Sequence, residues 1–165
     1  MAQGSDTGSA MGKDMGAILT LVKGYTARMR QVTPRDLTVL IVDDEEPVRK
    51  FVDRVLSDAG YKTALAGDGP EAIEVASKLD RVDVLLTDVM MPEMQGDELA
   101  RRLRQQEPAL KVLYLTGYSD RLFKDKITLW EDEAFLDKPC SVKGLLQAVS
   151  LLLFGRVEQP KESMS

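Results

Sequence analysis

The stretch Leu37-Thr38-Val39-Leu40-Ile41-Val42-Asp43-Asp44 places a mostly apolar run directly before two adjacent aspartates. A short run rich in leucine and β-branched residues predicts a strand buried on both faces, as in a parallel sheet covered by helices. A second run, Val82 to Thr87, ends in the same way on Asp88. Carboxylates at the carboxyl ends of two such strands are expected to project into the crevice where open α/β sheets bind ligands.

Three carboxylates at one edge of a sheet imply a bound cation. Asp43, Asp44 and Asp88 would raise one another's pKa values if they shared a small site without a neutralising charge. A hard divalent ion prefers oxygen ligands of this kind. The sequence therefore predicts a metal site, most simply for Mg²⁺.

Two later strand ends complete a set of groups suited to phosphoryl transfer. The run Lys111 to Leu115 ends in Thr116-Gly117, and the run Ala134 to Asp137 ends in Lys138-Pro139. Aspartyl phosphorylation needs a carboxylate nucleophile, a cation and a hydrogen-bond donor for the transferring oxygens. The carboxylates, Mg²⁺, the Lys138 ammonium and the Thr116 hydroxyl supply these groups.

The order of these motifs resembles the receiver domain of bacterial response regulators, the phosphoacceptor module of two-component systems. The resemblance covers Leu37 to about Phe154. It is carried by four segments: VLIVDDEEPVRK (39–50), VLLTDVMMPEMQGDEL (84–99), VLYLTGY (112–118) and FLDKP (135–139).

The resemblance assigns a role to each residue of the candidate site. It implies that Asp88 is phosphorylated from a phosphohistidine on a sensor histidine kinase or a phosphotransfer protein, with Thr116 and Lys138 as catalytic groups. It also implies a cis Lys138-Pro139 bond, and an Mg²⁺ ion held directly by Asp44 and through water by Asp43, an assignment that spacing alone does not make. The complete implied metal set is Asp43, Asp44, Asp88 and the Met90 carbonyl.

The resemblance further implies a switch. Thr116 and Phe135 would move after phosphorylation and repack the surface formed by the expected helix 120–129, the strand 133–137 and the helix 141–154. Walking the last helix at roughly 100° per residue puts Leu151 and Phe154 on its exposed side, which favours partner binding or homodimer formation there. The core-facing stripe would comprise Val142, Leu145, Leu146, Val149, Leu152 and Leu153.

Two other functions remain as alternatives. A degenerate receiver would act as an interaction module without phosphorylation, but Asp88, Thr116 and Lys138 are all present. An aspartyl-phosphate phosphohydrolase would need an acid at Met90, two residues after Asp88. We therefore expect no enzyme in the usual sense, only Mg²⁺-dependent self-phosphorylation from a donor. Self-dephosphorylation should be slow, because neither Met90 nor Tyr118 is a carboxylate or an amide that would hold the attacking water.

Composition excludes several other classes of protein. The 165 residues carry a formal net charge of −5, and the pI of about 4.9 argues against direct nucleic-acid binding by this chain. There is no histidine, which removes histidine-ligated metals and a phosphohistidine of the chain's own. The single cysteine, Cys140, excludes an internal disulfide and fits the cytoplasm. No apolar run approaches the roughly 20 residues that span a bilayer, so we expect no membrane association.

The alternation of strands and helices predicts a doubly wound α/β fold with a five-stranded parallel sheet and helices on both faces. By resemblance the fold is flavodoxin-like, with strand order 2-1-3-4-5. The expected strands are 38–42, 62–66, 83–87, 111–116 and 133–137. The expected helices are 47–59, 69–79, 96–106, 120–129 and 141–154.

The regions that flank the expected receiver domain, 37–154, differ from it in composition. Residues 155–165 form a short tail that we expect to be disordered, and the glycine- and serine-rich start of region 1–36 is expected to be disordered or non-native. The rest of that region is either a linker from a larger protein or a dimerising helix. The apolar seam behind the second interpretation is Met15, Ile18, Val22, Tyr25, Met29 and Val32.

Overall fold

The computed structural model describes residues 32–117 and 132–155. The expected helix 120–129, Tyr118, almost all of the apolar seam before Thr33 and the tail from residue 156 lie outside the described residues. The predictions for these segments therefore stay predictions.

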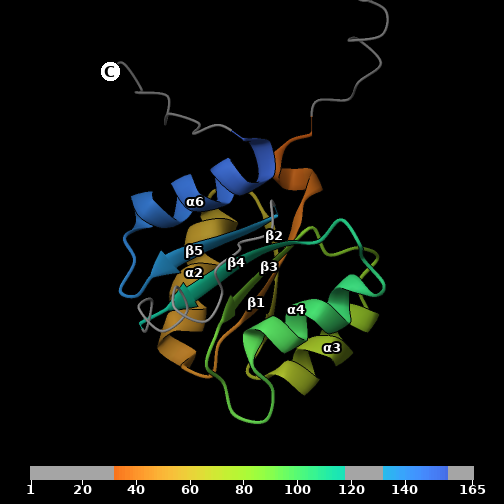
Figure 1. The fold of residues 1–165 in the computed structure, drawn as a ribbon. Helices are drawn as coiled ribbons and strands as arrows, with labels where there is room; N and C mark the ends of the chain where they lie inside the picture. Colours follow the sequence, from red (N-terminus) through yellow and green to blue (C-terminus); the bar gives the residue numbers. More distant parts are fainter. Residues whose placement is uncertain (1–31, 118–131, 156–165) are drawn as a thin grey trace, which may run out of the picture. The chain divides into compact units, whose positions relative to one another are not determined.

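Five parallel strands form one sheet in the order β2-β1-β3-β4-β5, which confirms the expected fold class (Figure 1). Four strands have the expected bounds, and β3 lies one residue later than expected. The strands are β1 (Thr38–Val42), β2 (Lys62–Ala66), β3 (Val84–Asp88), β4 (Lys111–Thr116) and β5 (Glu133–Asp137).

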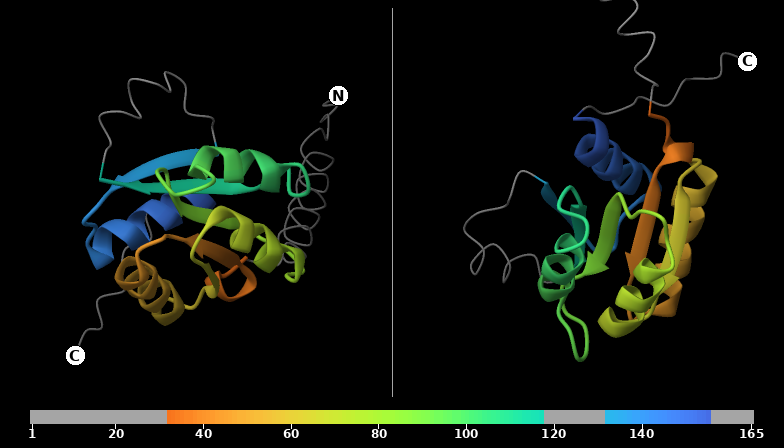
Figure 2. Two further views of the ribbon diagram at one scale, coloured as in Figure 1. Left: turned by 90° about the horizontal axis from the view of Figure 1, so that it is seen from below. Right: turned by 90° about the vertical axis from the view of Figure 1, so that its right-hand side faces the viewer.

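Helices cover both faces of the sheet, α2 and α6 on one face and α3 and α4 on the other (Figures 1 and 2). Alternate residues of β1 explain the two cores, because Val39 and Ile41 pack toward α2 and α6 while Leu40 and Val42 pack toward α3 and α4. The described helices are α2 (Glu46–Asp58), α3 (Gly69–Ser77), α4 (Gly96–Arg104) and α6 (Val142–Phe154), preceded by the short 3₁₀ helix η1 (Pro34–Asp36). Among the described residues, no helix is long and apolar enough to cross a membrane.

Asp83 lies at the amino-terminal edge of the sheet, directly before β3. Its Oδ2 accepts a hydrogen bond from the Thr38 N–H at 2.9 Å, and its Oδ1 lies 2.6 Å from Nε of Arg81. The residue is 7% exposed. The carboxylate therefore satisfies the first backbone donor of β1, while the Asp83 N–H donates to the Thr38 carbonyl at 2.9 Å.

The packing of α6 corrects the predicted stripe at both ends. Leu145 and Val149 are fully buried as expected, but Val142 is 50% exposed. Leu151 is 53% exposed as predicted, whereas Phe154 is half-buried and packs against the core shared with α2. Phe154 is the last residue of α6, and Gly155 ends the helix with φ 65°. At this helix end the large ring of Phe154 reaches the core, although its position on the helical wheel points to the exposed side.

Candidate functional site

The three predicted carboxylates meet at the carboxyl edge of the sheet. Asp43 and Asp44 follow β1, Asp88 ends β3, and one oxygen from each lies within 4.8 Å of the others. Asp43 is 1% exposed, Asp88 is half-buried and Asp44 is exposed. The set therefore runs from the interior of the sheet to the solvent.

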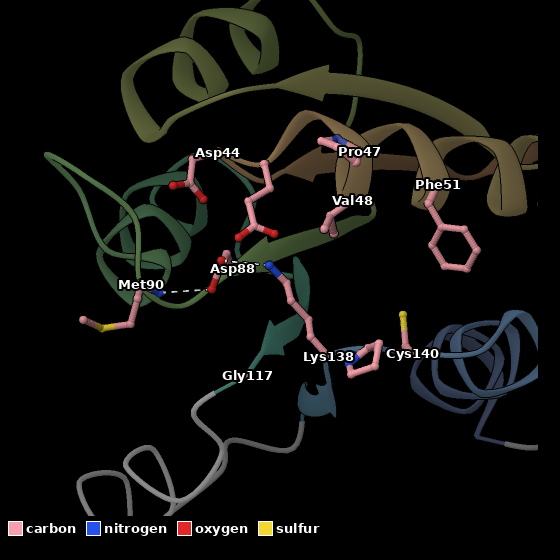
Figure 3. A pocket seen from close by; sticks show the side chains of 11 residues that line it. Asp44, Pro47, Val48, Phe51, Asp88, Met90, Gly117, Lys138 and Cys140 are labelled. Atoms are coloured by element: carbon pink, nitrogen blue, oxygen red, sulfur yellow. Dashed lines mark hydrogen bonds and ion pairs between the residues drawn. The ribbon is translucent and has the colours of Figure 1, made fainter.

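Lys138 reaches two of these carboxylates from the end of β5. Its Nζ lies 2.6 Å from Oδ2 of Asp43 and 2.9 Å from Oδ2 of Asp88. The Lys138 N–H donates to the carbonyl of Thr116 at 3.0 Å, and the Lys138-Pro139 bond is cis, as expected from the resemblance. Figure 3 shows the ammonium pointing at Asp88.

Burial and the shared ammonium act in opposite directions on the two buried groups. Burial raises the pKa of Asp43 above its usual range, against the Lys138 ammonium and the Glu45 N–H, which lower it. Burial alone would lower the pKa of Lys138, but Asp43 and Asp88 together outweigh it and the pKa is raised. The pKa of Asp43 is therefore raised because burial outweighs the opposing effect of its ion pair.

The arrangement fits a divalent cation. Three carboxylates against one ammonium leave two negative charges. Oδ2 of Asp43 is buried, and its partner among the described residues is the Lys138 ammonium, which also pairs with Asp88. The Asp44 carboxylate makes no hydrogen bond or ion pair with another described residue. These oxygens are the ligands that Mg²⁺ prefers.

The structure places the other predicted site residues around this edge. Met90 lies at the rim, 50% exposed, and its N–H donates to Oδ1 of Asp88 at 3.2 Å. Thr116 ends β4 and is buried beside the exposed Gly117. Phe135 lies away from the carboxylates, stacked on Tyr114 with ring centroids 5.1 Å apart. Met90 thus lies beside the carboxylates at the edge of the sheet. Phe135 packs instead against the core between the sheet and helices α3 and α4.

Glycine keeps the loop after β3 close to its own strand. A Cβ on Gly96, the first residue of α4, would clash with the backbone carbonyl of Asp88. The Gly96 N–H donates to the carbonyl of Val89 at 2.9 Å. Between these residues, Glu93 has φ 67°, a left-handed conformation that costs a side-chain-bearing residue energy. The sequence signal for this close approach is Gly96 itself, eight residues after Asp88.

An open pocket of about 690 Å³ borders Asp44, Asp88 and Lys138 (Figure 3). Phe51 on α2 is 38% exposed and lines this pocket. Sequence reasoning missed this apolar wall, although Phe51 follows Pro47 by one helical turn, outside the buried side of α2. Its members are Pro47, Val48, Phe51, Met90, Pro139 and Cys140.

The sequence matches the family described as "Response regulator receiver domain" over residues 39–150. It is 38% identical over 117 residues to the sensor kinase CckA of Brucella abortus, covering 70% of this chain and 12% of that protein. It is 31% identical over 115 residues to the response regulator receiver protein CpdR of the same organism, covering 70% of this chain and 95% of that protein. The chain thus spans about an eighth of the kinase but nearly all of CpdR.

Solved structures agree. The chemotaxis response regulator CheY4 of Vibrio cholerae is 34% identical with a TM-score of 0.63, covering 71% of this chain and 98% of that one. The receiver domain of the hybrid histidine kinase CckA is 31% identical with a TM-score of 0.60, covering 70% of this chain and 98% of that one. With the motifs of four strand ends assembled at one acidic edge, this chain belongs to the response regulator receiver domains of two-component systems.

Proposed function

We propose that this chain is a phosphoacceptor of a phosphorelay, taking a phosphoryl group from a partner's phosphohistidine onto Asp88 in the presence of Mg²⁺. One observation carries the proposal: Asp88 is half-buried at an open pocket, and its carboxylate lies beside the Lys138 ammonium and two further aspartates. A carboxylate that merely capped a turn would not need this surrounding charge.

The chemistry follows from these contacts. An Asp88 oxygen attacks phosphorus, the P–N bond of the donor breaks, and an acyl phosphate forms on the aspartate. The Lys138 ammonium, 2.9 Å from Oδ2 of Asp88, offsets charge on the transferring oxygens, and Thr116 donates to one of them. Asp43, Asp44, Asp88 and the Met90 carbonyl would hold the ion. Bound Mg²⁺ would supply charge neutralisation for the same oxygens.

The donor is a protein, a sensor histidine kinase or a phosphotransfer protein. The chain contains no histidine, so the phosphohistidine belongs to a partner. The apolar wall beside Asp88 supports this assignment, because an exposed phenylalanine next to a polar centre suits a protein surface rather than a small phosphate donor. We expect Phe51→Lys to slow transfer from the partner while leaving phosphorylation by acetyl phosphate unchanged.

The output passes through protein contacts. Phosphorylation draws Thr116 and Lys138 toward the phosphoryl group and repacks Phe135, which now lies half-buried on Tyr114. This biases a two-state surface formed by the helix expected at 120–129, β5 and α6 toward a downstream protein, a domain outside this chain or a second copy. The exposed Leu151 of α6 supports such a surface. Self-dephosphorylation is slow, because the Met90 side chain at the rim cannot hold an attacking water by hydrogen bonds. The protein acts in the cytoplasm.

The test uses Mg²⁺ and a small phosphodonor, acetyl phosphate, with intact-protein mass spectrometry. We expect one phosphoryl group on the wild type, stable in acid and labile in base, and none on Asp88→Asn. An unmodified wild type would favour the degenerate receiver. Rapid steady hydrolysis of acetyl phosphate without an accumulating adduct would favour the phosphohydrolase.

A further inference from the structure

We propose that Arg49 of α2 is a positioning residue for the metal ligand Asp44, acting through the peptide group that joins Asp43 to Asp44. The inference deepens the proposed function and rests on it, because it concerns the same Mg²⁺ site. Arg49 lies six residues after Asp43 and does not line the pocket beside Asp88.

The contact is a short hydrogen bond to the backbone of a site residue. Nη1 of Arg49 donates to the carbonyl oxygen of Asp43 at 2.6 Å. The N–H of Asp43 donates in turn to the carbonyl of Ala66 in β2, at 3.3 Å. Both peptide groups of Asp43 are thus anchored, one by the neighbouring strand and the other by α2.

Asp44 depends on this anchor more than its two partners do. The carboxylate of Asp43 accepts from the Glu45 N–H at 2.8 Å and pairs with Lys138, and that of Asp88 is held by Lys138 and by the Met90 N–H. Among the residues that the structure describes, the Asp44 carboxylate has no such contact, so only the backbone of Asp44 is held. The carbonyl of Asp43 and the N–H of Asp44 share one rigid plane, and fixing the carbonyl fixes that plane.

The guanidinium of Arg49 lies close to Gly67, the residue that follows β2. Nη1 of Arg49 lies 3.4 Å from the point where a Cβ of residue 67 would be, and residue 67 is glycine. Oε2 of Glu71 lies 3.3 Å from the same point and accepts the Gly67 N–H at 2.8 Å. A side chain at position 67 would crowd both groups. The absence of a side chain at Gly67 therefore leaves room for the half-buried, planar guanidinium of Arg49.

A pure charge effect would have the opposite sign. A cation near three carboxylates weakens the binding of another cation, so removing it would strengthen Mg²⁺ binding. Positioning predicts that removal weakens Mg²⁺ binding. Substitutions that keep or remove the charge separate the two effects.

The experiment measures the apparent Kd for Mg²⁺ alone from the thermal unfolding midpoint at constant ionic strength. Arg49→Met removes the donor and the charge but keeps an apolar stem, and Arg49→Lys keeps the charge without the planar fork. Arg54→Met, which removes an exposed arginine of the same helix, is the control. We expect the Kd to rise about tenfold in Arg49→Met, the range for residues that orient metal ligands, less in Arg49→Lys, and not at all in Arg54→Met.

A second readout separates positioning from a structural role. At saturating Mg²⁺, acetyl phosphate should phosphorylate Arg49→Met within about twofold of the wild-type rate, because only the occupancy of the metal site has changed. An unchanged Kd with a lower midpoint at every Mg²⁺ concentration would mean a structural arginine and would overturn the inference. A tighter Kd would mean a charge effect and would also overturn it. A wild type whose midpoint ignores Mg²⁺ would overturn the proposed metal site itself, a result distinct from the other two.

Discussion

Two buried aspartates, Asp83 at the amino-terminal edge of the sheet and Asp43 at the carboxyl edge, have opposite surroundings. Asp83 is 7% exposed, and its two oxygens have separate partners, the Thr38 N–H and Arg81. Asp43 is 1% exposed and shares the Lys138 ammonium with Asp88, while Asp44 adds a third negative charge. At the amino-terminal edge each oxygen of the carboxylate has its own partner. At the carboxyl edge three carboxylates share one ammonium, so negative charge is in excess.

The difference separates a structural carboxylate from a functional one. A buried carboxylate with a partner for each oxygen stabilises the fold and offers nothing to a ligand. Carboxylates that outnumber their cations favour any state that brings another cation to them. Burial alone does not distinguish the two cases, since both side chains are nearly inaccessible.

The largest expected effect is the loss of stability in Asp83→Ala. This variant leaves the Thr38 N–H without its acceptor and should lower the free energy of unfolding by about 2 kcal/mol, mostly from that donor because Arg81 is largely exposed. Asp83→Asn keeps an acceptor and should lose less. Urea unfolding measures both. If Asp83→Ala also lost its response to Mg²⁺, the two edges would not be independent.

The next effect concerns the metal at the carboxyl edge. Wild-type protein should gain about 1.4 kcal/mol of stability at a Mg²⁺ concentration ten times the Kd, and Asp44→Ala and Asp88→Ala should gain none. Unfolding curves with and without Mg²⁺ measure this. Asp83→Ala is the matched control and should keep the full gain. A wild-type midpoint that does not move across the titration would contradict the excess-charge interpretation of this edge.

Alkaline pH should reveal a third contribution, from the middle of the sheet. Burial raises the pKa of Tyr114, whose hydroxyl donates to Glu133. A folded-state pKa above the unfolded value of about 10 gives stability that is present below pH 10 and lost as the pH rises further. At pH 10.5 this loss is at most about 0.8 kcal/mol, and Tyr114→Phe should remove it. The loss that remains in Tyr114→Phe contains the contribution of Lys138, whose pKa is also raised.

The measurement for Tyr114→Phe is the urea midpoint from pH 8 to 11. The variant should be slightly less stable than wild type at pH 8, because it lacks the hydroxyl, and the gap should shrink as the pH rises. A gap that widened with pH would show that the tyrosine ionises more readily in the folded protein, against its burial.

The smallest effect tests backbone strain at the functional edge. Glu93 has φ 67°, so Glu93→Gly should relieve the strain of a left-handed conformation. Glycine also makes the unfolded chain more flexible, which opposes this gain, and the net stabilisation should be about 0.5 kcal/mol. Asp80→Gly, in the loop before β3 at the opposite edge, is the control and should destabilise by a similar amount. Differential scanning calorimetry detects both. Stability changes of the same sign in the two variants would show that backbone strain does not distinguish the two edges.

The sequence by itself determined the sheet, the strand ends and the acidic edge. Short apolar runs are local signals, and in a parallel sheet all carboxyl ends lie at one edge, so Asp43, Asp44, Asp88 and Lys138 had to converge once the strands formed. The cis Lys138-Pro139 bond followed from resemblance rather than from such a signal. The strand bounds were predicted to within one residue, because glycine, proline and charged residues mark them.

Only the tertiary structure decided how the side chains pair across that edge. The ammonium of Lys138 is shared between carboxylates on β1 and β3, Arg49 reaches the carbonyl of Asp43, and Phe154 turns into the core. Each contact joins parts of the chain whose distance depends on packing, loop path and the end of a helix. A helical angle or a residue spacing specifies a direction but not the partner that meets it, and for that reason the charge balance of the site appears only in the folded protein.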